Sequence, residues 1–307
     1  MRSGTALTKK DVVVVLCCAV FLLVNIGSVG RAGRERAMRE ICLANLRQLT
    51  LAWTQYADDN SDKLCNASAG FTRQKGWTGY MGVPLAGDEI PWCGWVDPRN
   101  CATTPPDEWT HKQIAAIDYT KQRSRDGTWT GDDTPGHNPN PTLLNNWVLW
   151  KYVGNLKIYK CPAGRQEEYR NYGIVDAMNG ASAYWDGQGN QPLAPCYKLR
   201  SQIENGGERF VFMDEGVCWP DSFTVRWSTV DAAQWWDLPS NRHSNGTTVS
   251  FADGHAEYRK WVDNRTIALG DDKDNGRNPS PGNLNGVGNK DFEWLEIGAC
   301  GGWKTEN

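Results

Sequence analysis

The segment "RHSNGTTVSFADGHAEYRKW", Arg242 to Trp261, decides the β-structure expected of this chain. Its Asn245-Gly246 and Asp253-Gly254 pairs are both favoured at the centre of two-residue hairpin turns. Residues 247–252 and 255–261 are rich in β-branched and aromatic side chains, as strands are. The segment therefore predicts a three-strand antiparallel meander whose first strand ends near Ser244.

Strand alternation in this register assigns a face to each side chain of the meander. The core face is expected to carry Val249, Phe251, Ala256 and Tyr258. The opposite face is expected to carry the more polar set, namely Thr248, Ser250, His255, Glu257 and Arg259.

A metal or catalytic centre is a second interpretation of the same segment. It would use Asp214, His243, Asp253 and His255, and it requires residues 240–247 to fold back as an open loop. In the meander, His243 and Asp253 would be roughly 17 Å apart at about 3.3 Å per residue. No single metal ion with ligand bonds of about 2 Å can bridge that distance. Two interpretations stay open: polar residues that hold the strand ends, or a metal centre.

The amino-terminal region predicts one long helix over residues 7–60. Residues 12–30 contain no charged side chain, and nineteen helical residues cover about 30 Å, so a transmembrane span is expected over residues 12–30. Beyond it, apolar residues continue at steps of three and four, which predicts an amphipathic second half. These residues are Met38, Cys42, Leu46, Leu49, Trp53 and Tyr56.

The chain has ten cysteines, of which Cys17 and Cys18 lie in the apolar run. The other eight are an even number spread along the chain without the close pairs of a zinc ribbon. This pattern favours disulfides formed in an oxidising compartment, and Cys93 with Cys101 is the local pair expected. Buried reduced thiols are the alternative.

Several motifs resemble those of type IV pilin-like proteins, including the pseudopilins of type II secretion. "MRSGTALTKK" is similar to their short basic leader, and "CLANLRQLTLAWTQYADDN" to the run that follows their apolar helix. "VFMDE", "YKCPAG" and "RHSNGTTVSFADGHAEY" resemble their carboxy-terminal signature, in which His243 precedes Asp253 and Gly254 by nine intervening residues. Ala6 stands where the leader peptidase normally requires glycine, and Asp11 replaces the usual glutamate.

The resemblance implies that residues 1–6 are a leader removed after Ala6 by a prepilin peptidase, which leaves Leu7 as a methylated first residue. It implies that Asp11 pairs with the amino terminus of a neighbouring subunit, because an isolated carboxylate at membrane depth is costly. An uncleaved anchor, with Asp11 as a simple helix cap, is the alternative. The implied location is the bacterial inner membrane, crossed once, with the head of residues 61–307 periplasmic or extracellular. The implied partners are membrane lipid and other pilin-like subunits.

Two further features suggest ligands. Trp77, Trp92 and Trp95 lie in Gly/Pro-rich stretches and are candidates for stacking on a glycan, although loops also use tryptophan to bury area. The acidic run Asp271 to Gly276 suggests calcium, but its carboxylates do not fall at the alternating positions of a calcium loop, so a solvated turn is favoured and no cofactor is expected.

The composition and motifs indicate a function class. A net charge of -3 offers no electrostatic footprint for nucleic acid. The chain shows no P-loop, dinucleotide fingerprint or nucleophile motif, so a non-enzymatic protein is expected. The fold class expected is α+β, with the long helix packed on a small antiparallel sheet and long disulfide-braced loops. The leading hypothesis is a pseudopilus subunit; the alternatives are a tethered glycan-binding protein and a metal-dependent hydrolase.

Overall fold

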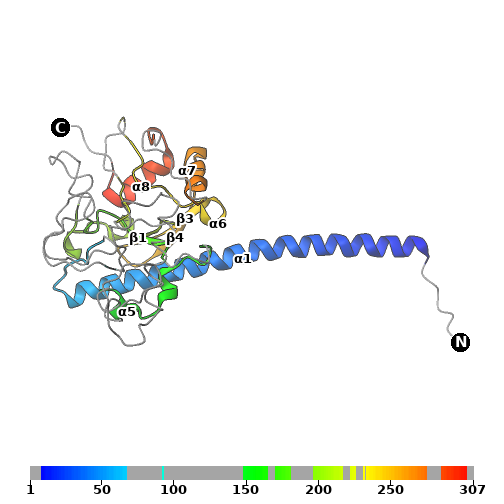
Figure 1. The fold of residues 1–307 in the computed structure, drawn as a ribbon, viewed down its shortest axis with the longest axis horizontal. Coiled ribbons are helices and arrows are strands. Elements are labelled where there is room, and N and C mark those ends of the chain that lie inside the picture. Colours follow the sequence, from blue (N-terminus) through cyan, green and yellow to red (C-terminus); the bar gives the residue numbers. More distant parts are fainter. Residues whose placement is uncertain are drawn as a thin grey trace, which may run out of the picture.

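The computed structural model describes residues 8–67, 92, 148–164, 170–180, 196–216, 222–225, 231, 233–274 and 285–302. These residues form an α+β head around one four-stranded antiparallel sheet, with a long helix that extends away from it (Figure 1). The amino-terminal end of the described chain lies at the far tip of that helix, and the carboxy-terminal end lies at the head.

The long helix, α1, is Lys9–Asp59. It begins with a capping box in which the Thr8 side chain accepts from the Asp11 amide while the Asp11 carboxylate accepts from the Thr8 amide. It ends at Asn60, after which Ser61 and Asp62 take positive φ values of 57° and 67°. The helix therefore has a defined start and a defined stop.

The sheet has the strand order β1-β2-β3-β4, and every neighbouring pair is antiparallel. The strands are β1 (Tyr172–Ile174), β2 (Phe210–Asp214), β3 (Gly246–Phe251) and β4 (Ala256–Lys260). The short helical elements are α5 (Trp150–Val153), η2 (Leu156–Tyr159), η4 (Arg200–Gln202), η5 (Gly206–Glu208) and α6 (Arg242–Asn245). Two longer helices, α7 (Asn264–Asp274) and α8 (Lys290–Cys300), complete the head.

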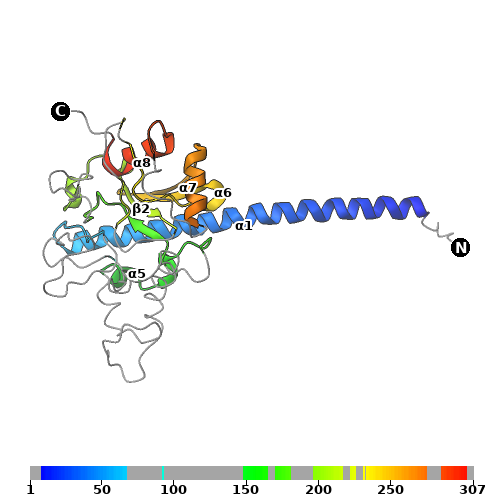
Figure 2. The same ribbon diagram turned by 45° about the horizontal axis from the view of Figure 1, so that its top comes forward.

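Helices cover both faces of the sheet, as Figure 2 also shows. The carboxy-terminal half of α1 lies on one face, where Thr50 donates to the Ser250 hydroxyl at 2.6 Å. α8 lies on the other face, where the Trp294 and Phe210 rings are 4.7 Å apart. Every residue of β2 and β3 is consequently buried.

The β3–β4 hairpin forms, but two details of the predicted meander are wrong. Residues 242–245 form the tight turn α6 instead of a first strand. Val249 pairs with Glu257, and Ser250 with Ala256, so the faces are shifted by one residue on β4 relative to the expectation. The polar residues Thr248 and Ser250 therefore face α1, not solvent. Alternation cannot separate inside from outside in a strand that is buried on both faces.

The predicted membrane span over residues 12–30 is wrong. Among the helices of the described residues, none is both long enough and apolar enough to cross a membrane. The single-pass inner-membrane location depended on this span and is contradicted with it.

The predicted disulfide bracing is also wrong, because the structure forms no disulfide among the cysteines that it describes. Cys42 and Cys161 carry free thiols in the core, as the alternative of buried reduced thiols required. The pair Cys93 and Cys101 lies outside the described residues.

The structure describes only part of the glycan candidate and part of the calcium candidate. Trp92 is fully buried, with its ring 5.9 Å from that of Tyr159 and 5.2 Å from that of Phe212, so it cannot stack on a sugar. Trp77 and Trp95 lie outside the described residues. In the calcium candidate, residues 271–274 form the last turn of α7, which is a helix rather than a loop, and Gly276 is not described.

Candidate functional site

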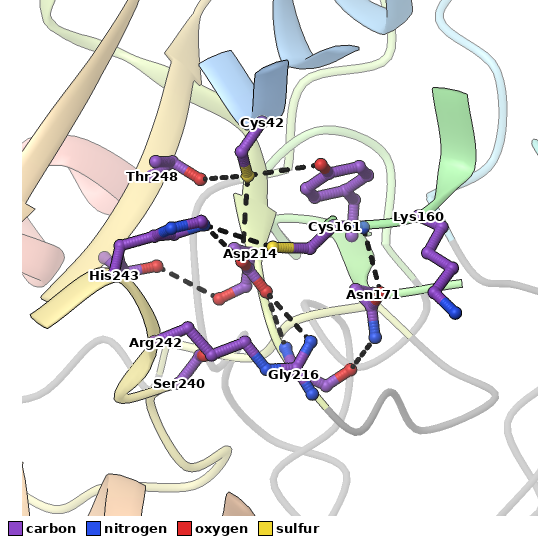
Figure 3. Close-up of polar contacts among 12 residues, drawn as sticks. Cys42, Lys160, Cys161, Asn171, Asp214, Gly216, Ser240, Arg242, His243 and Thr248 are labelled. Atoms are coloured by element: carbon purple, nitrogen blue, oxygen red, sulfur yellow. Dashed lines mark hydrogen bonds and ion pairs between the residues drawn. The ribbon is translucent and has the colours of Figure 1, made fainter. Parts of the chain in front are cut away.

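Four chemically reactive side chains meet inside the head, each from a different element. Cys42 comes from the buried side of α1, and Cys161 from the chain just after η2. Asp214 is the last residue of β2, and His243 belongs to α6. We call these four residues the cysteine–aspartate–histidine cluster; Figure 3 shows their side chains pointing toward one another.

The distances within the cluster are those of directly contacting polar atoms. His243 Nε2 lies 3.1 Å from Cys161 Sγ and 3.8 Å from Asp214 Oδ2. Cys42 Sγ lies 3.8 Å from the same Asp214 oxygen. One ligand-type atom from each residue lies within 4.8 Å of all the others, and all four residues are buried.

A left-handed turn brings His243 into the cluster. His243, Ser244 and Asn245 have φ values of 57°, 65° and 64°, in the region that side chains other than glycine rarely adopt. Each such residue costs about 1–2 kcal/mol relative to right-handed backbone. Three in a row next to a buried polar cluster indicate that the surrounding contacts hold the turn in place.

The surroundings of the cluster are polar as well. The Thr248 hydroxyl lies 2.9 Å from Cys42 Sγ, and the Tyr172 hydroxyl donates to the same sulfur at 3.1 Å. The Gly216 amide donates to Asp214 Oδ1 at 3.0 Å, and Arg242 Nη1 lies 4.0 Å from that oxygen. His243 Nδ1 faces Glu35 Oε1 at 3.5 Å. Cys42, Asp214 and His243 therefore each have a polar neighbour outside the cluster.

These contacts change the pKa values of the two thiols in opposite directions. Burial disfavours the Cys42 thiolate, but hydrogen bonds with Cys161 and His243 outweigh it and lower the pKa of Cys42 to about 7. Burial, the hydrogen bond with Cys42 and the charge of Asp214 raise the pKa of Cys161 well above its usual value. Burial opposes protonation of His243, but Cys42 and Asp214 raise its pKa overall. The cluster thus stabilises one thiolate beside an imidazolium.

The structure separates the four residues that the sequence offered as one metal site. Asp214 and His243 come together in the cluster. Asp253 and His255 do not: they pair with each other at 2.6 Å in the turn after β3, where both side chains are about half exposed. Gly254 adopts φ 98° at that turn, which explains the glycine there. His243 and Asp253 stand beyond opposite ends of β3, as the distance argument against a shared site requires.

Sequence reasoning missed the two cysteines of the cluster. Cys42 was placed on the apolar side of the helix and Cys161 in the "YKCPAG" motif, and both were counted toward disulfides. A thiol on the apolar side of a helix, together with His243 in another motif of the resemblance, was the available signal. Of the processing and assembly candidates, Ala6 and Leu7 lie outside the described residues. Asp11 is exposed and caps α1.

The arrangement is suited to holding an ion or a thiolate away from solvent. The exposed fractions of the Cys42, Cys161 and Asp214 residues are 0%, and that of His243 is 3%. Comparison of the chain with models of protein families, with curated proteins and with solved structures found no match.

Proposed function

We propose that this protein is a non-enzymatic, pilin-like subunit that assembles with copies of itself through the amino-terminal half of α1. The head is then displayed on the outside of the assembly. Figure 1 shows α1 extending beyond the head. The observation that carries the proposal is that this part of the helix exposes large apolar side chains.

The projecting half of α1 exposes large apolar side chains on all of its sides. Val12, Val13, Val14, Val15 and Leu16 are consecutive, and their exposed fractions lie between 46% and 61%. Successive residues of a helix are about 100° apart, so these five side chains surround the axis. Soluble proteins rarely leave such a contiguous apolar surface exposed, and one of this kind marks an interaction site.

Copies of the same helix are the partner that fits this surface. A single groove would cover only one side, whereas the apolar residues surround the helix and need neighbours on several sides. A bundle of equivalent helices supplies them. Burying one valine or leucine side chain stabilises an assembly by roughly 1.5–3 kcal/mol, so a few such contacts per neighbour are sufficient.

The position of the head supports the same arrangement. The head contacts α1 from about Glu35 onward, so it leaves the first part of the helix accessible from all sides. Charged residues lie between the two parts: Arg34, Glu35, Arg36, Arg39 and Glu40. The motif resemblance to pilin-like proteins adds support, because their subunits associate through this helix.

Sedimentation velocity of the purified full chain tests the proposal. We expect the wild-type protein to form large, concentration-dependent oligomers, and Val14→Asp to shift the population to monomer. Leu51→Asp is the matched control, since Leu51 is 57% exposed on the same helix but lies within the head region. The control should assemble like the wild type.

Two results would overturn the proposal. One is a wild-type protein that stays monomeric at all concentrations. A monomer that binds lipid vesicles but does not self-associate counts as the same result. The other is Val14→Asp oligomers as large as those of the wild type. Circular dichroism of both variants verifies that the helix remains folded.

A further inference from the structure

We propose that Cys42, Cys161, Asp214 and His243 bind one zinc ion, which joins α1 to the sheet and to the turn α6. The inference is independent of the self-assembly proposed above, since it concerns the interior of the head. It rests on the geometry of the four side chains and on the contacts that orient them.

The spacing of the four ligand atoms is close to that of a zinc tetrahedron. Zn–S bonds of about 2.3 Å and Zn–N or Zn–O bonds of about 2.0–2.1 Å place tetrahedral ligands about 3.3–3.8 Å apart. His243 Nε2 to Asp214 Oδ2 and Cys42 Sγ to Asp214 Oδ2 are both 3.8 Å, and His243 Nε2 to Cys161 Sγ is 3.1 Å. No pair exceeds 4.8 Å. Shifts of a few tenths of an ångström to about an ångström would seat the ion.

The contacts around the cluster leave the metal-facing atoms available. Asp214 Oδ1 accepts from the Gly216 amide, so Oδ2 is the oxygen turned toward Cys42 Sγ and His243 Nε2. His243 Nδ1 faces Glu35, so Nε2 points into the cluster. A carboxylate next to the second nitrogen of a ligating histidine is the usual outer partner at zinc sites, where it fixes the ring orientation.

The charges also balance with a divalent ion. Two thiolates and one carboxylate carry three negative charges, against two positive charges on zinc. The buried guanidinium of Arg242, 4.0 Å from Asp214 Oδ1, supplies the remaining positive charge. The hydroxyls of Thr248 and Tyr172 lie against Cys42 Sγ, where they can donate to a thiolate. Buried charges are tolerated when they are paired in this way.

The ligand set selects the kind of ion and its role. Calcium and magnesium take oxygen ligands, whereas two thiolates with an imidazole are typical of zinc. Four protein ligands in a buried site leave no open position for a substrate, which is the property of a structural site. The zinc would hold together four segments that are far apart in sequence, so its binding energy would stabilise the folded head.

Metal analysis of the purified full chain is the first test. After dialysis against zinc and removal of free metal, we expect one zinc ion per chain. Replacing it with Co²⁺ should give the visible absorption of a tetrahedral cobalt site together with a thiolate-to-cobalt charge-transfer band. Adding a strong chelator should lower the thermal unfolding midpoint, and zinc should restore it.

Variants then assign the ligands. Cys161→Ser and His243→Gln should lose the ion, whereas Cys300→Ser should keep it. Cys300 is the matched control, since it is also a buried cysteine but lies on α8 at the opposite face of the sheet. Glu35→Gln tests the positioning role and should weaken zinc binding about 10-fold to 100-fold, with Glu40→Gln unchanged.

The wild-type measurements keep the inference falsifiable even where a variant fails to fold. Folded wild-type protein that holds no zinc after zinc loading would overturn the inference. This applies whether the thiols are reduced or Cys42 and Cys161 form a disulfide, which non-reducing peptide mass spectrometry distinguishes. Full zinc occupancy in folded Cys161→Ser would overturn the assignment of the ligands.

Discussion

The two halves of α1 have the same backbone conformation and opposite surroundings. In the projecting half, Leu16 is 58% exposed. No labelled element lies beside this dark-blue part of the helix in either view (Figures 1 and 2). In the half within the head, Leu46, Leu49 and Trp53 are fully buried. Since both halves carry apolar side chains, the difference lies in their partners. The second half finds its partner in the sheet of its own chain, whereas the described side chains of the first half are exposed, and the proposed self-assembly would cover them.

The largest expected effect separates the two halves with one matched pair of substitutions. Leu46→Ala removes a fully buried side chain and should destabilise the head by about 2–5 kcal/mol. Leu16→Ala changes an exposed side chain and should change head stability by less than about 0.5 kcal/mol. Urea unfolding followed by tryptophan fluorescence measures both. Equal losses would mean that the projecting half packs on the head.

Glycine provides the next contrast. A Cβ on Gly298 of α8 would overlap the Phe210 ring, so Gly298→Ala should destabilise the head by about 1–3 kcal/mol through overpacking. A Cβ on Gly33 of α1 meets nothing within 4 Å, so Gly33→Ala should increase helix stability by about 1 kcal/mol. Thermal unfolding checks the first variant, and helical circular dichroism the second. A gain of stability in Gly298→Ala would contradict the close packing of α8 on β2.

The sequence predicted correctly which side of α1 is buried, but not which parts of the molecule surround the helix. The apolar spacing at Cys42, Leu46, Leu49 and Trp53 identifies residues that the structure buries completely. A spacing pattern shows that a helix has an apolar side, but not what covers it. The same limit explains the wrong membrane span, since an apolar run is equally compatible with lipid and with other helices.

For a related reason, the sequence predicted only two of the four residues of the cysteine–aspartate–histidine cluster. Asp214 and His243 were among the metal candidates because of their residue types and neighbouring motifs. Asp253 and His255 were added because they are near in sequence, but the hairpin places them in its turn. The left-handed turn that aims His243 inward has no reliable sequence signal, since it uses three residues other than glycine. Pairing Cys42 with Cys161 requires the tertiary structure.

A smaller effect is expected from the polar contact between α1 and β3. The Thr50 hydroxyl is fully buried and lies 2.9 Å from the Leu46 carbonyl oxygen and 2.6 Å from the Ser250 hydroxyl. Thr50→Val keeps the shape and should cost about 0.5–1.5 kcal/mol, because Ser250 still accepts from the Phe212 amide. Thr54→Val, at a partly exposed position of the same helix, is the control. Equal unfolding midpoints of the two variants would show that the contact between Thr50 and Ser250 does not stabilise the head.

The smallest expected effect is at the tip of the projecting half. Hydrogen bonds from the Thr8 side chain and amide lower the pKa of Asp11, so the capping contribution is complete above an ordinary aspartate pKa of about 3.9 and is lost as pH falls through the lowered value. Asp11→Asn should speed amide hydrogen exchange in the first turn of α1 and leave the unfolding midpoint of the head unchanged. At acidic pH, the first turn of the wild-type protein should exchange as fast as that of Asp11→Asn measured at the same pH.

This substitution also separates two roles for the acid. If Asp11 acts through its local cap, Asp11→Asn should retain the oligomers of the wild type, because the apolar side chains from Val12 onward are unchanged. If it pairs with the amino terminus of a neighbouring subunit, as in the proteins that this sequence resembles, removal of the charge should dissociate the oligomers while Val14 remains intact. Sedimentation velocity of the variant distinguishes the two. The capping contacts of Thr8 favour the local role, and dissociation would show that the projecting half uses charge as well as apolar surface.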